Sequence, residues 1–299
     1  MNKTKITFLT DWGSSPQYCY DFYNKFNPND DGCYNNLESV LTVDEADVVF
    51  IMQGTGNLSL PADMIRKLKT KRIYVIVHEP PNITSNLGIH RIPEELREQA
   101  ILVDCFSQPI WYLSKGELIH SHKFHDFLDM EYTERTKKLS CIVSGKQYIP
   151  GHKSRLRFIN ELISKEPNLL TLYGRNNLPT NKGSLDANKK YLAYEGFEYT
   201  LCFENNRIPY YFSDKIFDSL LMWSMPIYWG APNIGEHLPP DSFHMLGENL
   251  DSVDIEKVKD ICKNPPTKRN IEAMKEAREL IVNKYSMWPT FEYILKEYE

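Results

Sequence analysis

The sequence predicts an α/β protein made of two Rossmann-like, doubly wound domains in tandem. The first observation is that short apolar runs alternate with helical patterns along the chain, as in parallel sheets with helical crossovers. The second is the length of 299 residues, which suits two domains of about 150 residues each. The third is a composition of 41% hydrophobic and 25% charged residues, which is that of a chain with a packed core.

Four apolar runs predict the strands of the first domain. Such continuous runs are typical of strands that a parallel sheet buries on both faces. They cover residues 5–10, 46–52, 72–77 and 100–106. Helices are expected at 60–68, where Pro61 suits a first helical position, and at 93–99. Residues 17–43 are rich in Asn, Asp and Tyr, so they are expected to form a loop and a short helix.

The periodicity stops between residues 112 and 138 and starts again in a second domain. Its strands are predicted at 139–144, 169–173, 199–203, 226–229 and 243–246. Helices outside the stretch discussed below are predicted at 156–163, 253–263, 268–283 and 288–298. We therefore expect domains at 1–135 and 136–285, with a C-terminal helical segment, 286–299, that packs back on the first domain.

Charge and targeting signals narrow the class of protein. A net charge of −5 gives no reason to expect nucleic acid as a partner, so any phosphate site must be local. The N-terminus, MNKTKITFLTDWG, has the pattern of a first strand rather than a signal peptide. No window approaches the roughly 18 apolar residues of a membrane span. We therefore expect a cytoplasmic protein.

The cysteines and histidines do not predict a metal site. The six cysteines are scattered without a C-x-x-C pair, and Cys141 and Cys202 lie in apolar strand patterns, so buried free thiols are expected. His120, His122 and His125 are close together, but their spacing suits no common zinc pattern and no cysteine is near. A solvated connecting segment is the preferred interpretation, and no metal ligand is assigned.

The most informative stretch runs from residue 191 to residue 234. A predicted strand ends in the polar triplet Glu204-Asn205-Asn206, and a second strand follows after a helix. Ser213 has the pattern of the N-cap of that helix, with Asp214 in the first turn and Lys215 just inside it. Strand, helix and strand form a βαβ unit, and its strand ends and helix N-terminus are where such units bind anions and nucleotides.

Three basic residues of the second domain follow strands or open helices. Arg175 ends a strand, while Arg155 and Lys215 lie near helix starts. The carboxyl ends of parallel strands meet at one edge of a sheet, so these cations are expected to converge on a common site, where they can hold a diphosphate. No P-loop and no G-x-G-x-x-G motif is present, so kinase-like and hydride-transfer functions are disfavoured.

Three carboxylates are candidates for chemistry. Glu204 can accept hydrogen bonds from sugar or ribose hydroxyls, or it can cap a helix or pair with Arg207. Glu79 follows an apolar strand between a histidine and two prolines, where a raised pKa would suit a general base, although a surface turn is the simpler interpretation. Asp11 is a second candidate by the same logic. The two sets of strand ends are expected to meet across a cleft.

Four motifs resemble those of the α-1,3-fucosyltransferases, glycosyltransferase family ten. They are YTLCFEN at 199–205, YFSDK at 211–215, PIYWGAP at 226–232 and HEPP at 78–81. The segment 139–177, with Arg155 and the YGR turn, also follows that family. The resemblance covers most of the second domain but only the surroundings of Glu79 in the first.

The resemblance implies a GT-B architecture, with two domains facing a central cleft, and an inverting transfer of fucose from GDP-β-L-fucose. Glu79 would be the general base that deprotonates the acceptor hydroxyl, and Arg175 and Lys215 would hold the diphosphate. The remaining donor-binding residues that it implies are Ser144, Arg155, Glu204, Asn205, Tyr211, Ser213 and Asp214. Asp214 departs from the family pattern, which has glutamate there, so its carboxylate reaches one methylene less far.

The resemblance further implies that no cofactor and no essential divalent metal is needed, and that the acceptor is an oligosaccharide or a glycoconjugate. It implies a bacterial or viral enzyme that lacks the membrane anchor of animal members. Two alternatives stay open. The same fold can use another nucleotide sugar, or the chain can be a nucleotide-sugar- or glycan-binding protein without turnover, which would need Arg175 and Lys215 but not Glu79.

Overall fold

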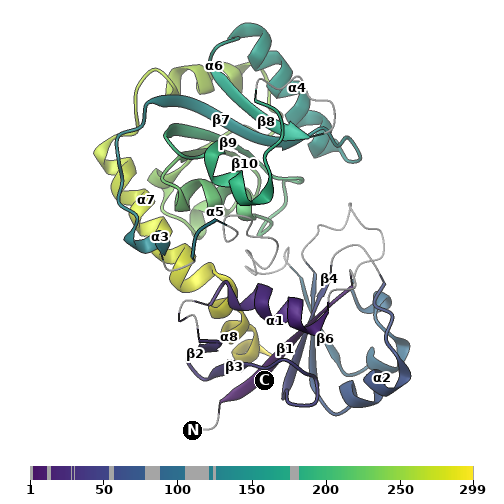
Figure 1. The fold of residues 1–299 in the computed structure, drawn as a ribbon. Helices are drawn as coiled ribbons and strands as arrows, with labels where there is room; N and C mark the ends of the chain where they lie inside the picture. The colour runs from purple at the N-terminus through teal and green to yellow at the C-terminus, as the bar shows by residue number, and fades with distance from the viewer. Residues whose placement is uncertain are drawn as a thin grey trace. The chain divides into compact units, whose positions relative to one another are not determined.

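A computed structural model describes residues 3–11, 15–27, 29, 31–53, 57–77, 88–104, 121–123, 126–175 and 182–298. The chain divides into two compact units (Figure 1). Unit 1 comprises Met1–Leu113 together with Tyr285–Glu299, and unit 2 comprises Ser114–Lys284. The domain boundary expected after residue 135 therefore lies inside unit 2, whereas the one expected after residue 285 lies one residue beyond its end.

Unit 1 is built on a six-stranded sheet with the order β2-β3-β1-β4-β5-β6. Its strands are β1 (Thr4–Thr10), β2 (Cys33–Tyr34), β3 (Leu37–Ser39), β4 (Val48–Gln53), β5 (Arg72–Val77) and β6 (Ala100–Asp104). Every pairing is parallel except that of β2 with β3. Its helical segments before the C-terminal region are α1 (Pro16–Asn24), α2 (Ala62–Leu68) and the 3₁₀ turns η1 (Ile89–Arg91) and η2 (Glu94–Leu96).

Two expectations for unit 1 were wrong. Residues 17–43, expected to be a loop and a short helix, also contain β2 and β3, because these strands are two and three residues long and too polar to give an alternating signal. The helix expected at 93–99 is the single 3₁₀ turn η2, in which only Leu96 is buried. One buried side chain does not supply the apolar stripe that holds a longer helix.

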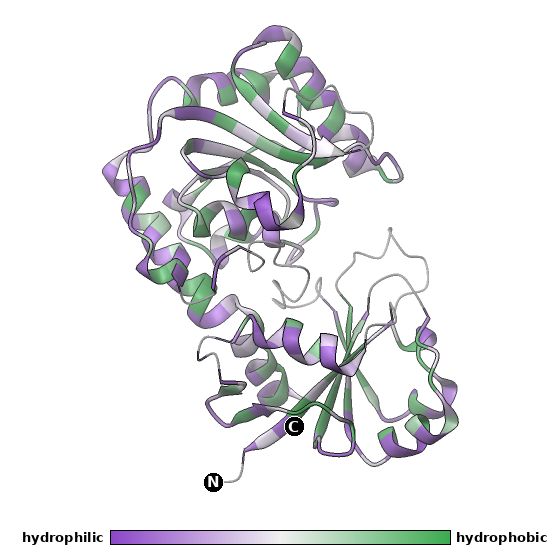
Figure 2. Cartoon of the chain, viewed as in Figure 1, coloured by the Kyte–Doolittle hydropathy of each residue, from purple (hydrophilic) through white to green (hydrophobic). Residues whose placement is uncertain are grey.

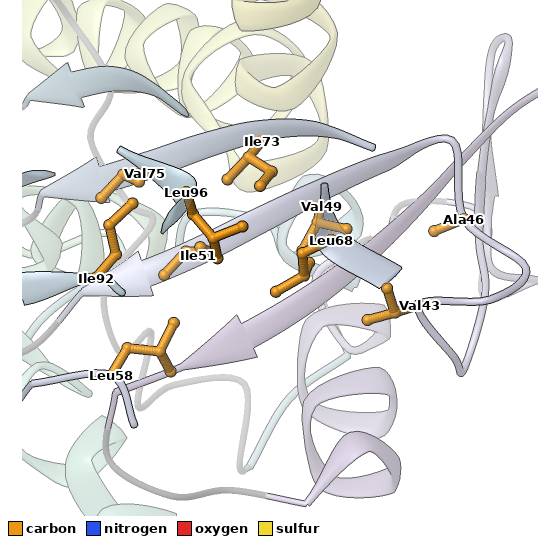
Figure 3. Close-up of a cluster of buried hydrophobic side chains, with 10 residues drawn as sticks. All are labelled: Val43, Ala46, Val49, Ile51, Leu58, Leu68, Ile73, Val75, Ile92 and Leu96. Carbon is orange, nitrogen blue, oxygen red and sulfur yellow. The ribbon is translucent and has the colours of Figure 1, made fainter. Parts of the chain in front are cut away.

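The core of unit 1 explains why its strands are continuous apolar runs. Alternate residues of β4 and β5, such as Val49 and Ile73, pack with α2 and the 3₁₀ turns on one face of the sheet (Figure 3). Phe50 lies on the opposite face, where its ring centroid is 4.5 Å from that of Phe291 in α8 (Met287–Glu297). Both faces are thus covered, and the C-terminal helix belongs to unit 1.

Gln53 fixes both ends of the segment that follows β5. Its backbone pairs in register with Val77, the last residue of β5. Its buried side-chain amide donates to the carbonyl of Gly88 and accepts from the Gly88 N–H, both at 2.9 Å. Gly88 has a φ of +98°, which only glycine adopts without strain. Residues 78–87 between these anchors, which include Glu79, lie outside the described residues.

Unit 2 is built on an all-parallel sheet with the order β11-β10-β9-β7-β8. Its strands are β7 (Lys137–Ser144), β8 (Leu170–Arg175), β9 (Phe197–Phe203), β10 (Met225–Trp229) and β11 (His244–Met245). Its helices are α3 (Asp126–Asp129), α4 (Pro150–Lys165), α5 (Asp214–Leu221), α6 (Ser252–Ile261) and α7 (Lys268–Leu280), and the π-helical turn η7 (Ile281–Tyr285) follows α7. Its 3₁₀ segments are η4 (Ala187–Ala193), η5 (Ile234–Glu236) and η6 (Pro240–Ser242).

The topology of unit 2 predicts a ligand crevice at the carboxyl end of its sheet. From β7 the chain passes through α4 to β8 on one side, and then returns to β9 on the other side of β7. Doubly wound sheets bind ligands at such a switch in strand order. Ser144 at the end of β7 and Glu204 after β9 flank this switch.

The predicted class, α/β with two Rossmann-like doubly wound domains, is confirmed. Figure 2 shows hydrophobic residues concentrated in the central strands of unit 1 and hydrophilic residues interspersed along the helices. The expected burial of the free thiols of Cys141 and Cys202 is also confirmed, and burial raises the pKa of Cys141 to about 12. Within the described ranges, the protein has no helix with the length and apolar character needed to cross a bilayer.

Candidate functional site

The carboxylate of Glu204 organises the start of helix α5. Glu204 is fully buried directly after β9, and its oxygens accept from the backbone N–H of Ser213 at 2.8 Å and from the Ser213 hydroxyl at 2.9 and 3.0 Å. The ammonium of Lys215 lies 3.1 Å from the same carboxylate. Glu204 therefore pairs with Lys215 rather than with Arg207, the partner that the sequence suggested, and this contact holds the cation at the helix N-terminus.

Helix α5 begins as its local sequence predicts. Ser213 is the N-cap, and its hydroxyl oxygen accepts from both the backbone N–H and the ammonium of Lys215, the latter at 2.8 Å. Burial would lower the pKa of Lys215, but Glu204 and Asp214 outweigh it and raise that pKa. The lysine is therefore charged at neutral pH, and 28% of its side chain is accessible. It presents a positive charge where the helix dipole already attracts anions.

Asp214 lies beside this lysine and is bound by a residue that the sequence did not single out. The Lys190 ammonium in η4 is 2.6 Å from one Asp214 oxygen and 2.8 Å from the buried carboxylate of Asp218. Burial alone would raise the pKa of Asp214, but Lys190 and Lys215 together lower it to about 2. Lys190 gave no motif signal, because its partners lie 24 and 28 residues further along the chain.

Arg155 joins the three elements that border the switch point. Its guanidinium is buried in the first turns of α4, where it donates to the side-chain oxygen of Asn205 at 3.0 Å and to the Ser144 hydroxyl at 3.2 Å. These contacts connect the end of β7, the start of α4 and the segment after β9. Burial lowers the pKa of Arg155, which nonetheless stays charged because an arginine titrates far above neutrality.

His152 is neutral and its tautomer is set by its neighbours. Burial, together with Arg155, lowers its pKa to about 4. Because Arg155 can only donate, it fixes which side-chain atom of Asn205 is the oxygen, and that oxygen is 3.2 Å from His152 Nε2. Nε2 must therefore carry the proton. Nδ1 of His152 has no hydrogen-bond partner among the described residues.

The α4 helix starts six residues before the predicted start at 156, and its first turn packs tightly on the Asn205 backbone. A Cβ on Gly151 would lie 2.2 Å from the Asn205 carbonyl oxygen, which is far inside contact distance. We expect Gly151→Ala to displace Asn205, to lower the free energy of unfolding by about 1–3 kcal/mol and to weaken nucleotide binding. Urea unfolding and calorimetric titration measure both effects.

Gly235→Ala is the matched control, because a Cβ there meets nothing within 4 Å. It should leave stability and binding near wild type. Equal behaviour of the two variants would contradict the close approach at Gly151.

The structure brings seven of the predicted site residues to one edge of the unit 2 sheet. They are Ser144, Arg155, Glu204, Asn205, Ser213, Asp214 and Lys215. Tyr211 is buried in the segment before α5, and Arg175 pairs in register with Ser144 at the end of β8. The predicted base Glu79 lies outside the described residues. His152, Gly151 and Lys190 were not assigned to the site beforehand.

Arg155, Lys190 and Lys215 are cations at this edge, and the strand that bears Arg175 ends there. Arg155 is bound to neutral partners, and Lys215 is partly accessible beside two carboxylates. The buried polar groups, the helix N-terminus and the switch point are the features of a site for a phosphorylated ligand. Among the described residues, no group of three His, Cys, Asp or Glu side chains is arranged to hold a metal ion.

Part of unit 2 matches a known protein family. Residues 132–253 match the family model described as glycosyltransferase family 10 (fucosyltransferase), C-terminal part. This part of unit 2 is similar to glycosyltransferase family 10. The predicted resemblance is thereby confirmed, and the Glu204, Asp214 and Lys215 cluster lies inside the matched residues of the family 10 domain.

One sequence relative and two solved structures are similar to this chain. An α-(1,3)-fucosyltransferase of Helicobacter pylori is 38% identical over 47 residues, a stretch that spans 16% of this chain and 10% of that protein. A crystal structure of an α1,3-fucosyltransferase aligns with 99% of this chain and 90% of its own, with a TM-score of 0.56 and 18% identity. A crystal structure of an α1,3-fucosyltransferase with GDP-fucose aligns with 100% of this chain and 92% of its own, with a TM-score of 0.51 and 18% identity. The structural likeness shows a shared GT-B fold.

Proposed function

We propose that the protein is an inverting glycosyltransferase that moves fucose from GDP-β-L-fucose to a hydroxyl group of an oligosaccharide or glycoconjugate acceptor. The observation that carries the proposal is the Glu204–Ser213–Lys215 cluster at the start of α5, inside the family 10 match. It presents a fixed cation to the crevice, as departure of a nucleoside diphosphate requires.

In this mechanism the family 10 domain binds the donor. Lys215 and Arg175 stabilise the negative charge that develops on the leaving diphosphate, while Arg155 holds Asn205 in place at the same sheet edge. Glu79 of unit 1 removes the proton from the acceptor hydroxyl, whose oxygen then attacks the anomeric carbon as the bond to the diphosphate breaks. Attack from the face opposite the leaving group inverts the anomeric configuration.

We further propose that the protein requires no cofactor and no divalent ion, since its own cations supply the charge that a metal would, and that it acts in the cytoplasm. The alternative donor is a different nucleotide sugar. One observation favours it: Asp214 stands where family 10 has glutamate, and its carboxylate is already bound to Lys190. An aspartate side chain reaches less far than glutamate, so it can bind a different hydroxyl group of the donor sugar. The donor is therefore the first property to test.

Thermal unfolding with a panel of nucleotides tests the donor. At a concentration of about 100 times Kd, GDP or GDP-fucose should stabilise the protein by about 2.7 kcal/mol, which corresponds to a rise in Tm of about 5–10 °C. UDP- and dTDP-sugars at equal concentration serve as controls and should give no shift. Stabilisation by UDP- or dTDP-sugars without any by GDP would overturn the fucose assignment. Persistence of transfer in EDTA checks the metal proposal.

A further inference from the structure

An alternating row of five charges runs from the interior of unit 2 to the start of α5. Asp218 pairs with Lys190, Lys190 pairs with Asp214, Asp214 faces Lys215, and Lys215 pairs with Glu204. The separations in that order are 2.8, 2.6, 3.8 and 3.1 Å. Asp218 and Glu204 at its two ends are fully buried, so only the middle of the row can meet a ligand.

Lys190 is the one member of this row that η4 supplies. Its side chain is 8% exposed, against 18% for Asp214 and 28% for Lys215. A one-to-one pair with buried Asp218 would already neutralise it. It binds Asp214 as well, through the oxygen Oδ2, and leaves Oδ1 on the side of Lys215. The ion pair with Lys190 therefore leaves Oδ1 as the Asp214 oxygen that faces Lys215.

We propose that Lys190 is a positioning residue of the donor site, which holds the carboxylate of Asp214 so that Oδ1 accepts a hydroxyl group of the nucleotide sugar. The proposal rests on the proposed function, because it assumes that the donor lies beside Lys215. Lys190 touches no donor atom and acts through Asp214. By fixing the orientation of the Asp214 carboxylate, Lys190 compensates for the aspartate side chain being one methylene shorter than glutamate.

The electrostatics give this role a measurable signature. The charged and titratable groups around Asp214 are Lys190, Lys215 and Tyr194, and Asp218 shares Lys190 with it. The Ser213 side chain also hydrogen-bonds to Asp214. Lys190 is the strongest influence that lowers the pKa of Asp214 against burial, and that pKa is about 2 in the intact site. Without Lys190 the effect of burial is less opposed, so the pKa of Asp214 rises. An uncharged Asp214 is a poorer acceptor for a hydroxyl donor.

Titration calorimetry with GDP-fucose on the full chain tests the proposal. Lys190→Met should weaken binding about tenfold, and Asp214→Asn should weaken it to a similar degree. Because Lys190 acts through Asp214, the double variant should bind no worse than Asp214→Asn alone. Wild-type affinity should be constant between about pH 8 and pH 5, whereas the affinity of Lys190→Met should fall as the pH decreases through this range.

Two further variants separate this role from folding. Lys190→Met/Asp218→Asn removes one buried charge of each sign, so it keeps the interior balanced while Asp214 still lacks its partner. It should show the same weak, pH-dependent binding. Lys138→Met is the matched control, because Lys138 pairs with Glu198 at 2.9 Å at the opposite end of the sheet. It should bind GDP-fucose like the wild type at every pH.

The proposal is overturned if Lys190→Met or Lys190→Met/Asp218→Asn binds GDP-fucose with wild-type affinity at every pH. Lys190 would then have only a structural role, as the ion-pair partner of Asp214 and Asp218. Additive losses in Lys190→Met/Asp214→Asn would also overturn it. If the wild type binds no GDP-fucose, the proposed donor is wrong, and the same series is measured with the nucleotide sugar that stabilises the protein. The two failures are thus distinguishable.

Discussion

Glu79→Gln is expected to lower the rate of transfer by a factor of about 10²–10⁴, because a glutamine cannot take the proton of the acceptor hydroxyl. In the proposed mechanism unit 2 binds the donor, so the Kd for GDP-fucose should not change. Initial-rate kinetics with a saturating donor, combined with calorimetry, separate the two quantities. The loss should appear in kcat.

Asp11→Asn is the comparison for this experiment. Asp11 follows β1 in the same unit and was the second carboxylate that the sequence offered as a base. Its variant should keep most of the activity. Transfer by Glu79→Gln at the wild-type rate would show that the base is another group, and a large loss in Asp11→Asn alone would identify it.

Glu204→Ala is expected to damage both folding and donor binding. The carboxylate is fully buried and is shared by Ser213 and Lys215, so its removal leaves a backbone N–H, a hydroxyl and an ammonium without their acceptor. The free energy of unfolding should fall by about 3 kcal/mol. Lys215 then keeps only its contacts with Ser213 and Asp214, and the affinity for GDP should fall at least about tenfold. Urea unfolding and calorimetry measure the two effects.

Glu198→Ala supplies the matched control at the start of the same strand. Glu198 also pairs with a lysine, Lys138, but that lysine is 45% exposed, so solvent screens the lost contact. The cost to stability should be no more than about 1 kcal/mol, and GDP binding should be unchanged. If Glu204→Ala and Glu198→Ala behave alike, Glu204 does not organise the helix start.

Sequence reasoning succeeded where the determining interactions are local. The start of α5 was predicted because a cap residue and the groups it binds lie within three positions of one another. The strand β5 was predicted with correct ends because its apolar run stops sharply. The sheet edge that unites Ser144, Arg155 and Lys215 followed from the rule that parallel strands end together.

What sequence reasoning missed depends on pairs that are distant along the chain. Lys190 meets Asp214 and Asp218 only after the chain has passed through β9, and nothing in its own surroundings distinguishes it from a surface lysine. Gly151 looks like an ordinary turn glycine until Asn205 is placed against it. The roles of Glu79 and Arg175 stay predictions, because the first lies outside the described residues and only the backbone of the second is described.

Gln53 joins the end of β5 to Gly88 in a way that tolerates changes in the sequence between them. The Gln53 side chain binds Gly88, eleven positions after Val77, through two hydrogen bonds to backbone atoms only. Backbone recognition does not depend on the sequence between the two anchors, and closing a loop costs little more when it is lengthened. Substitutions or insertions between Val77 and Gly88 are therefore expected to leave the register of β4 and β5 unchanged.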